Sequence, residues 1–331
     1  MKTIYSRNVN DAYAQCMVNV ENGSGLSSYP SRNGPMVEFN TPVTTIYKNP
    51  CERVLFDGVR DCNPFLHFFE SLWMLAGRDD LDFVTRYAKN MENFSDNGET
   101  LNGAYGFRWR NHFGYDQIED AYQELKKDPM SRRVVTQMWD GSESKLSKDI
   151  PCNTSIMWRL RGGILDMTVT NRSNDIIWGC YGANAVHFSF LHEYMAACLD
   201  VKVGYYYQIS NSLHYYPEFD VTKRILAGPR PPLGACAYER HEISHYPIFT
   251  GGATKAQFDG DLEAFFHEYD HGAGHHPITN FFKDVVHPMY LVHSLFKDGD
   301  KDEALRKCEY IAEFDWQLAC VEWLIRRGAE L

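Results

Sequence analysis

The residues best suited to chemistry are one cysteine and the arginines placed around it in the sequence. Cys152 follows Pro151, about twenty residues after Arg132-Arg133 and about twenty before Arg172. A cysteine attacks as the thiolate, and nearby guanidinium groups stabilise that form and lower the pKa of the thiol. Arginine also binds phosphate through two parallel hydrogen bonds. The pattern predicts an activated nucleophile beside an anion site, most simply for a phosphorylated substrate; the alternative is a buried strand cysteine with surface arginines.

The composition bounds the classes of protein to consider. With 331 residues, 44% hydrophobic and 14% aromatic, the chain can bury a large core in one elaborate domain or two. A net charge of −11 argues against direct nucleic-acid binding, although local arginines can still hold an anionic substrate. There is no membrane-spanning run and no signal-like N-terminus, and the nine cysteines form no CxxC pair. We therefore expect a protein with reduced thiols in a cytoplasm.

Local patterns predict helices and strands in alternation. A loop is expected at 22–34, and Gly162-Gly163 marks a hairpin. A mostly apolar segment at 185–199 predicts a buried central helix. The other expected helices are 11–20, 64–76, 115–127, 279–297 and 302–327, and the expected strands are 134–139, 155–160, 164–170 and 201–209.

Seven short motifs follow one another along the chain between about residues 31 and 235. They are 67–77 with Glu70, 102–110 with Tyr105, Ser131-Arg132-Arg133 followed by Trp139, Pro151-Cys152, Arg172-Ser173 with Asp175, Gly182-Ala183-Asn184, and 213–216. In this order they resemble the thymidylate synthase and pyrimidine nucleotide hydroxymethylase superfamily, and the phage-type deoxynucleotide hydroxymethylase branch is favoured. The resemblance implies a bacterial or phage-infected host cytoplasm.

The resemblance implies the fold class and the domain organisation. We expect an α/β (α+β) thymidylate synthase-like fold, with a mixed twisted sheet flanked by helices, as a catalytic core over residues 1–235. Residues 236–331 are expected to form a largely helical C-terminal extension packed on the core. Ordinary thymidylate synthases end instead in a short tail that closes over folate, and nothing here resembles that tail.

The resemblance also implies a mechanism and a co-substrate. Cys152 would add to C6 of a pyrimidine nucleotide, and C5 would then attack the methylene of 5,10-methylenetetrahydrofolate, with no metal. Glu70 would manage protons at the base carbonyl through water, and Tyr105 would assist removal of the C5 proton. Both roles require groups within hydrogen-bond reach of the ring.

Phosphate recognition is expected to involve two subunits. The family pattern assigns the phosphate to Arg172 and Ser173 of one subunit and to Arg132 and Arg133 of its partner, which implies a homodimer. Arg32 would add a contact from the loop at 22–34. The intact arginine pair and Ser173 resemble the deoxynucleotide branch, so a pyrimidine 2′-deoxynucleoside monophosphate is favoured.

The resemblance also indicates which residues would contact the base and the sugar. His214 and Tyr216 match the sugar-hydroxyl contacts. Asn184 matches the asparagine that reads uracil, provided that one residue is inserted; without the insertion Ala183 takes its place. An asparagine can turn its amide toward cytosine, and Asn174 could supply a second cytosine contact, so dUMP is favoured over dCMP without excluding it.

The final step decides between two enzymes, because water gives a 5-hydroxymethyl nucleotide and hydride gives thymidylate. Synthases exclude water with a tryptophan and the closing tail. Here the tryptophan position holds Met91 or Phe94, and Asn153, after the nucleophile, could position a water. Asp175 resembles the residue that contacts the pterin. We predict hydroxymethylation; ordinary thymidylate synthesis and dCMP or CMP hydroxymethylation remain alternatives.

Two functions of other classes also remain. A catalytically silent relative could bind nucleotide or a protein partner through its helical extension. Residues 267–271 spell HExxH, which on a helix could bind zinc with Glu268 as general base, and histidines follow at 275–276. The longer metzincin pattern fails by one residue, because Pro277 stands where its third histidine belongs.

Overall fold

The computed structural model describes residues 1–143, 146–229, 236–240, 243–272, 274 and 276–330. The chain divides into two compact units, one of residues 1–60 and 66–236 and one of residues 61–65 and 237–331. The functional division predicted from the sequence, a catalytic core in 1–235 and an extension in 236–331, stays a prediction.

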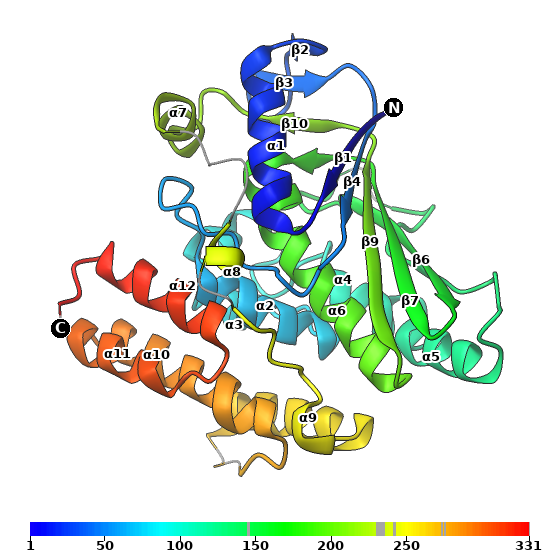
Figure 1. Cartoon of the computed structure of the whole chain (residues 1–331), viewed down its shortest axis with the longest axis vertical. Helices are drawn as coiled ribbons and strands as arrows, with labels where there is room; N and C mark the ends of the chain where they lie inside the picture. Colours follow the sequence, from blue (N-terminus) through cyan, green and yellow to red (C-terminus); the bar gives the residue numbers. More distant parts are fainter. Residues whose placement is uncertain (144–145, 230–235, 241–242, 273, 275, 331) are drawn as a thin grey trace. The chain divides into compact units, whose positions relative to one another are not determined.

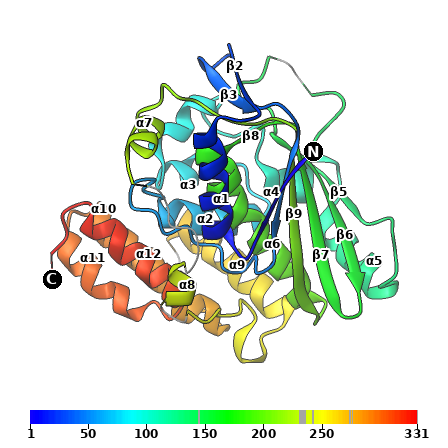
Figure 2. The ribbon, with the colours of Figure 1, turned by 45° about the horizontal axis from the view of Figure 1, so that its top comes forward.

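The first unit is built on a six-stranded mixed sheet. Its strands, in sheet order, are β1 (Lys2–Ser6), β4 (Val43–Tyr47), β9 (Lys202–Ser210), β7 (Ile164–Asn171), β6 (Asn153–Arg161) and β5 (Val135–Gln137). β1 and β4 are parallel, as are β7 and β9, and the other pairs are antiparallel. Figure 2 shows β9, β7, β6 and β5 side by side. The mixed sheet flanked by helices confirms the predicted fold class.

Helix α6 (Asn184–Cys198) packs on one face of this sheet, along β7 and β9 (Figure 1). Every residue from 184 to 196 is buried, as the continuous apolar pattern predicted. Strand residues alternate between the α6 side and the opposite side. On the opposite side Val135, Met157, Ile164 and Tyr205 are exposed. This sheet face therefore presents apolar side chains to solvent.

A second, four-stranded sheet brings distant segments together. Its order is β2 (Leu26–Tyr29), β3 (Met36–Phe39), β10 (Leu213–Tyr215) and β8 (Asn174–Asp175). The loop predicted at 22–34 is therefore partly wrong, because β2 pairs with β3. The glycines at 23 and 25, both with positive φ, end helix α1 and precede β2, and they conceal the short strand in the sequence.

The remaining helices that lie wholly or mostly in the first unit surround the sheets. They are α1 (Val9–Asn22), α2 (Pro64–Leu75), α3 (Leu81–Thr85), η1 (Lys89–Phe94), α4 (Tyr105–Phe107), η2 (Arg108–His112), α5 (Gln117–Lys127), η3 (Ile176–Ala183) and α7 (Asp220–Ala227). The close approach of α4 to α2 requires a glycine: a Cβ on Gly106 would lie 2.1 Å from the carbonyl oxygen of Met74. This crossing positions the tyrosine segment against the helix of Glu70.

The second unit is helical in its described part. It contains α8 (Ala237–Arg240), η4 (Thr250–Gly252), α9 (Lys255–His271), η5 (Phe282–Val286), α10 (His287–Lys297), α11 (Lys301–Lys307), η6 (Cys308–Tyr310) and α12 (Phe314–Ile325). The single helix predicted at 302–327 is interrupted, because the Ala312 N–H leaves the helical pattern and donates to the Asp284 carbonyl at 2.9 Å. Among the described residues, no helix combines the length and apolar character needed to cross a membrane.

Candidate active site

Cys152 and Arg172 lie side by side at the open end of the β6–β7 hairpin. The turn at Gly162-Gly163, with φ of 57° and 73°, closes the other end. The Arg172 N–H donates to the Cys152 carbonyl at 2.9 Å, and Nη2 of Arg172 lies 3.7 Å from Cys152 Sγ. Antiparallel pairing therefore brings the cysteine and a guanidinium group into contact.

The Arg172 guanidinium is oriented by the chain that precedes the cysteine. Nε donates to the Pro151 carbonyl at 2.8 Å and Nη2 to the Ile150 carbonyl at 2.9 Å. The group also lies over the Trp139 ring, 5.9 Å from its centroid. Nη1 donates to no group in the described part of the chain, and the side chain is exposed. Arg172 is thus fixed beside the thiol with donors left for an anion.

The charge balance at Cys152 differs from the prediction of an activated thiolate. Burial raises the pKa of the thiol above its ordinary value; Arg172 and Arg32 oppose this rise, while Asp149 and Asp175 add to it. The predicted lowering is therefore wrong for the protein alone, because burial and two carboxylates outweigh the guanidinium groups. The thiol is therefore neutral near pH 7.

Glu70, on α2, carries a carboxyl that is 15% exposed and protonated at neutral pH. Burial, and then the charge of Asp149, raise the pKa of Glu70 to about 8. Its Oε2 lies 3.3 Å from Nε2 of His187, whose pKa burial lowers to about 3. The contact therefore joins two neutral groups, and the geometry does not make a hydrogen bond: His187 Nε2 has no hydrogen-bond partner in the described part of the chain. Glu70 can act as a proton donor.

Tyr105 is tied to the cysteine segment through Asp149. The Gly103 N–H donates to Asp149 Oδ2 at 2.7 Å, and Asn102 Nδ2 donates to the Asp149 carbonyl at 2.9 Å. Burial raises the pKa of Tyr105 well above 10, and hydrogen bonds from the backbone of residues 152 and 153 oppose that rise. Asp149 is a site residue that the sequence reasoning missed; its only signal was its position three residues before Cys152.

The three predicted asparagines form one hydrogen-bonded group. Asn153 Nδ2 donates to Asn184 Oδ1 at 3.3 Å, and Asn184 Nδ2 donates to Asn174 Oδ1 at 3.0 Å. All three side chains are buried. The structure therefore places Asn184, rather than its neighbour Ala183, beside the residue that follows the nucleophile.

The predicted sugar contacts lie beside the segment that carries Arg32. His214, buried on β10, packs edge-on against Tyr216, with centroids 5.2 Å apart. Asn33 Nδ2 donates to the Tyr216 hydroxyl at 3.4 Å. Arg32 is exposed, and its charge acts on Cys152. Arg32 and the nucleophile therefore belong to one electrostatic site.

Asp175 caps η3 and leaves one carboxylate oxygen available. Its Oδ1 accepts from the N–H groups of Ile177 and Trp178 at 2.7 and 2.6 Å, and Oδ2 has no hydrogen-bond partner among the described residues. Burial raises the pKa of Asp175. Next to it, Trp178 is 50% exposed and stacks on the buried Arg60 guanidinium, 4.6 Å from the ring centroid. Sequence reasoning missed Trp178 and Arg60.

Two pairs of predicted site residues, Arg132 with Arg133 and Met91 with Phe94, do not contact Cys152 of the same chain. Arg132 and Arg133 precede β5, whose register with β6 places them near Arg159, about 24 Å along the strand from the cysteine. Met91 and Phe94 lie in η1, and no described hydrogen bond, ring contact or charge interaction joins them to Cys152. Their predicted roles stay predictions.

Ser173, between Arg172 and Asn174, is half-buried directly after β7. Its proximity to Arg172 follows from the sequence alone, and its predicted phosphate contact stays a prediction.

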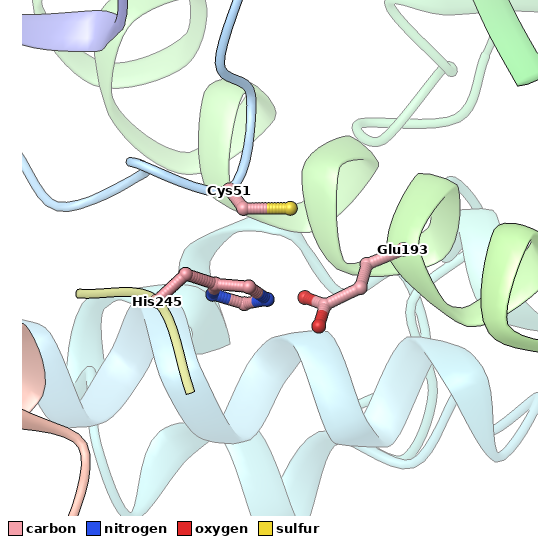
Figure 3. A group of neighbouring side chains, drawn as sticks. All are labelled: Cys51, Glu193 and His245. Carbon is pink, nitrogen blue, oxygen red and sulfur yellow. The ribbon is translucent and has the colours of Figure 1, made fainter. Parts of the chain in front are cut away.

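A separate cysteine in the first unit lies near a buried glutamate. Figure 3 shows Cys51 and Glu193, whose sulfur and carboxylate lie within 4.8 Å of each other. Arg53, also buried, pairs with the Glu193 carboxylate. The third labelled side chain, His245, belongs to the second unit. Cys51 and Glu193 do not by themselves make a metal centre, and the Glu193 charge is already balanced.

The HExxH histidines lie at the C-terminal end of α9. His267 and His271 stack with centroids 4.4 Å apart, and neither belongs to a cluster of three possible metal ligands in the described part of the chain. The following His275 lies outside the described residues. This arrangement gives the zinc interpretation no geometric support.

Comparisons with known proteins agree with the motif order. A family model described as "Thymidylate synthase" matches residues 60–241. The "Deoxyuridylate hydroxymethyltransferase" of Pseudomonas phage M6 is 41% identical over 344 residues, covering 99% of this chain and 95% of that protein. The protein of the same name in Bacillus phage SP01 is 43% identical over 196 residues, covering 55% of this chain and 51% of that protein. A "Thymidylate synthase" of Symbiobacterium thermophilum is 30% identical over 162 residues, covering 44% and 57%.

Proposed function

The chain belongs to the thymidylate synthase family, and we propose that it hydroxymethylates C5 of dUMP through a covalent adduct at Cys152. The observation that carries the proposal is the contact of Cys152 Sγ with the Arg172 guanidinium at 3.7 Å. A relative that matches 99% of this chain carries the name deoxyuridylate hydroxymethyltransferase, which favours uracil as the base and water as the final acceptor.

Cys152 opens the reaction by forming a bond from sulfur to C6 of the base. The thiol proton passes to solvent water as the sulfur attacks, and Arg172 stabilises the thiolate. Electron density then moves toward the base carbonyl, where protonated Glu70 can donate through a water molecule. Tyr105, beside the cysteine segment, would assist loss of the C5 proton. Each of these residues acts on a different atom of one ring.

Family members use methylenetetrahydrofolate as co-substrate, which supplies a one-carbon unit at the oxidation level of formaldehyde. The residues present fit such a group, because Asp175 keeps a carboxylate oxygen for N–H donors and Trp178 offers a half-exposed aromatic face. Arg60, stacked on that indole, adds positive charge. Met91 and Phe94 would border the same group and leave water access to the reacting carbon.

Phosphate binding completes the proposal with a second subunit. Arg172 and Ser173 would bind the phosphate from one subunit, and Arg132 and Arg133 from the partner. The exposed apolar face of the six-stranded sheet supports a homodimer, because such a face is typical of an interface. Arg132 and Arg133 lie at an end of the sheet remote from the cysteine of their own chain.

Subunit complementation tests this arrangement. A Cys152→Ala chain and an Arg132→Ala/Arg133→Ala chain are each expected to be inactive alone. In a mixed dimer one site combines the intact cysteine with the intact arginines, so about a quarter of wild-type activity should return after mixing, from half mixed dimers with one site each. Mixing Cys152→Ala with Glu70→Ala is the control, since both groups belong to the same subunit. Absence of recovery in the first mixture would contradict the shared site.

Ordinary thymidylate synthesis is the second candidate, supported by the family match and by the synthase from Symbiobacterium thermophilum. Product mass after incubation with dUMP and methylenetetrahydrofolate separates the two. A hydroxymethyl gain with release of tetrahydrofolate is the expected result. A methyl gain with dihydrofolate would replace the proposed final step by hydride transfer.

A further inference from the structure

Four buried side-chain amides form a continuous hydrogen-bonded chain that ends at the backbone. Beyond the Asn153–Asn184–Asn174 bonds, Asn174 Nδ2 donates to Gln208 Oε1 at 2.9 Å and to Ser210 Oγ at 3.0 Å. Gln208 Nε2 in turn donates to the Cys180 carbonyl at 3.1 Å. The amide residues are at most 7% exposed. Asn153, the residue next to the nucleophile, is therefore connected through three other amides to the backbone carbonyl of Cys180 on η3.

The Cys180 carbonyl determines how each side-chain amide in this hydrogen-bonded series is oriented, that is, which neighbour its NH2 group and its oxygen face. A carbonyl oxygen can only accept, so Gln208 must present its NH2 group to Cys180 and its oxygen to Asn174. Asn174 must then present NH2 to Gln208 and its oxygen to Asn184. Asn184 must present NH2 to Asn174, which directs its oxygen toward Asn153.

Tyr47 fixes the same direction through a second contact with the same carbonyl. Its hydroxyl donates to the Cys180 carbonyl at 3.2 Å, so its lone pair accepts from Gln208 Nε2 at 3.0 Å. The packing also preserves the chain: a Cβ on Gly179 would lie 2.8 Å from Asn174 Oδ1 and 3.2 Å from Asn184 Nδ2. Glycine at 179 leaves the room that this amide pair needs.

At the opposite end of the amide series, Asn153 does not restrict how the amides are oriented. Asn153 Oδ1 is buried and has no hydrogen-bond partner in the described part of the chain. Asn153 can therefore turn its amide to match either orientation of Asn184. Only the end at Gln208 and Cys180 distinguishes the two orientations.

The two candidate bases require opposite orientations of such an amide. Uracil donates from N3–H and accepts at O4, whereas cytosine accepts at N3 and donates from its amino group. In the fixed orientation, Asn184 retains one oxygen lone pair and one N–H, which match uracil. Reading cytosine would turn the Asn184 oxygen toward Asn174 Oδ1, placing two acceptors together.

We propose that Gln208 and Asn174 are positioning residues that fix the Asn184 amide and thereby make the site select uracil over cytosine. The inference rests on the proposed function, because it assumes that Asn184 reads the base. Both residues would act on the base only through Asn184. Asn174 is suited to this role because its side-chain amide is bonded to Gln208, Ser210 and Asn184.

The test removes the anchor while retaining the base-reading asparagine. In Gln208→Leu, Asn174 faces only the Ser210 hydroxyl on that side, which can both donate and accept, so the remaining amides can turn together. We expect the ratio of kcat/KM for dCMP to that for dUMP to rise at least about tenfold. Gln117→Leu is the matched control: Gln117 is equally buried and bonds backbone groups, but it lies outside the amide chain, so this ratio should not change.

Binding measurements separate this inference from the proposed reaction. Calorimetric dissociation constants for dUMP and dCMP should converge in Gln208→Leu and in Gln208→Met, the second variant in case the first does not fold. An unchanged ratio in a folded variant, or a wild-type protein that binds both bases equally, overturns the inference. A wild-type protein that binds dUMP selectively but does not convert it overturns the proposed function, while the shift in binding still decides the role of Gln208.

Discussion

Replacement of Asp149 by asparagine separates the charge of this residue from its attachment to the tyrosine segment. Asparagine retains an oxygen that can accept from the Gly103 N–H, now 2.7 Å from the carboxylate, so the attachment persists. The negative charge is lost. Burial and then the charge of Asp149 raise the pKa of Glu70 from 4.5 to about 8, so the variant removes only the second cause. We expect the pKa of Glu70 to fall but to remain above 4.5.

The size of the effect can be bounded. The rise in the pKa of Glu70 corresponds to a cost of about 5 kcal/mol for ionising this carboxyl, at about 1.36 kcal/mol per pH unit. Because burial is the larger cause, Asp149 accounts for less than half, or under about 2.4 kcal/mol. The proposed mechanism uses protonated Glu70, so we expect kcat/KM to fall as the pH rises through the pKa of this carboxyl. The basic limb should therefore move downward by at most about 1.8 pH units.

The assay is kcat/KM for dUMP between about pH 6 and 10, measured for wild type, Asp149→Asn and Asp120→Asn. Asp120 is exposed on α5, so its variant controls for the loss of one negative charge at the surface. A basic limb that stays at the wild-type position in Asp149→Asn, or that moves upward, would refute the coupling of the two carboxyls.

Three further predictions concern the nucleophile, the tyrosine segment and stability in acid. Cys152→Ser should lower kcat/KM at least about 10³-fold and abolish the covalent adduct with dUMP seen by intact-protein mass spectrometry, with unchanged circular dichroism. Gly103→Ala places a Cβ 2.6 Å from the Asp149 carboxylate, so kcat should fall about 10- to 100-fold in steady-state kinetics; Gly58→Ala, which points into open space, should be neutral. Burial lowers the pKa of His192 from 6.5 to about 4, so the unfolded chain binds this proton more readily and the folded state loses stability as the pH falls below 6.5. His192→Gln removes this group, so the stability that the protein loses between pH 7 and 5, measured by urea titration, should be smaller by about 2 kcal/mol.

The core of the site was predictable because its geometry follows from local patterns. Alternating burial in β6 and β7 and two glycines at the turn predict an antiparallel hairpin. Once that pairing is accepted, residues at its two open ends must be neighbours, which places Cys152 against Arg172. The rise in the pKa of the Cys152 thiol was not predictable from the sequence. It results from burial by segments distant in the sequence and from the charge of Asp149, which lies in an irregular segment.

Specificity was less predictable because it depends on side-chain direction. The sequence identified Asn184 and Asn174, but an amide has two orientations of equal shape. The deciding group is the Cys180 carbonyl, a backbone atom that carries no sequence signal, and it acts through Gln208 on β9. The crossing of α4 over α2 at Gly106 similarly depends on a close approach that only the assembled fold reveals.

Two buried polar atoms near Glu70 and Cys152 are candidates to bind a water molecule in the proposed reaction. His187 Nε2, beside Glu70, and Asn153 Oδ1, beside Cys152, are buried and have no hydrogen-bond partner in the described part of the chain. Each such atom costs about 1–3 kcal/mol unless a partner is supplied. A site that transfers hydride gains from excluding water, so buried unpaired acceptors would be a liability there. A site that ends its reaction with water can use the same atoms to bind it.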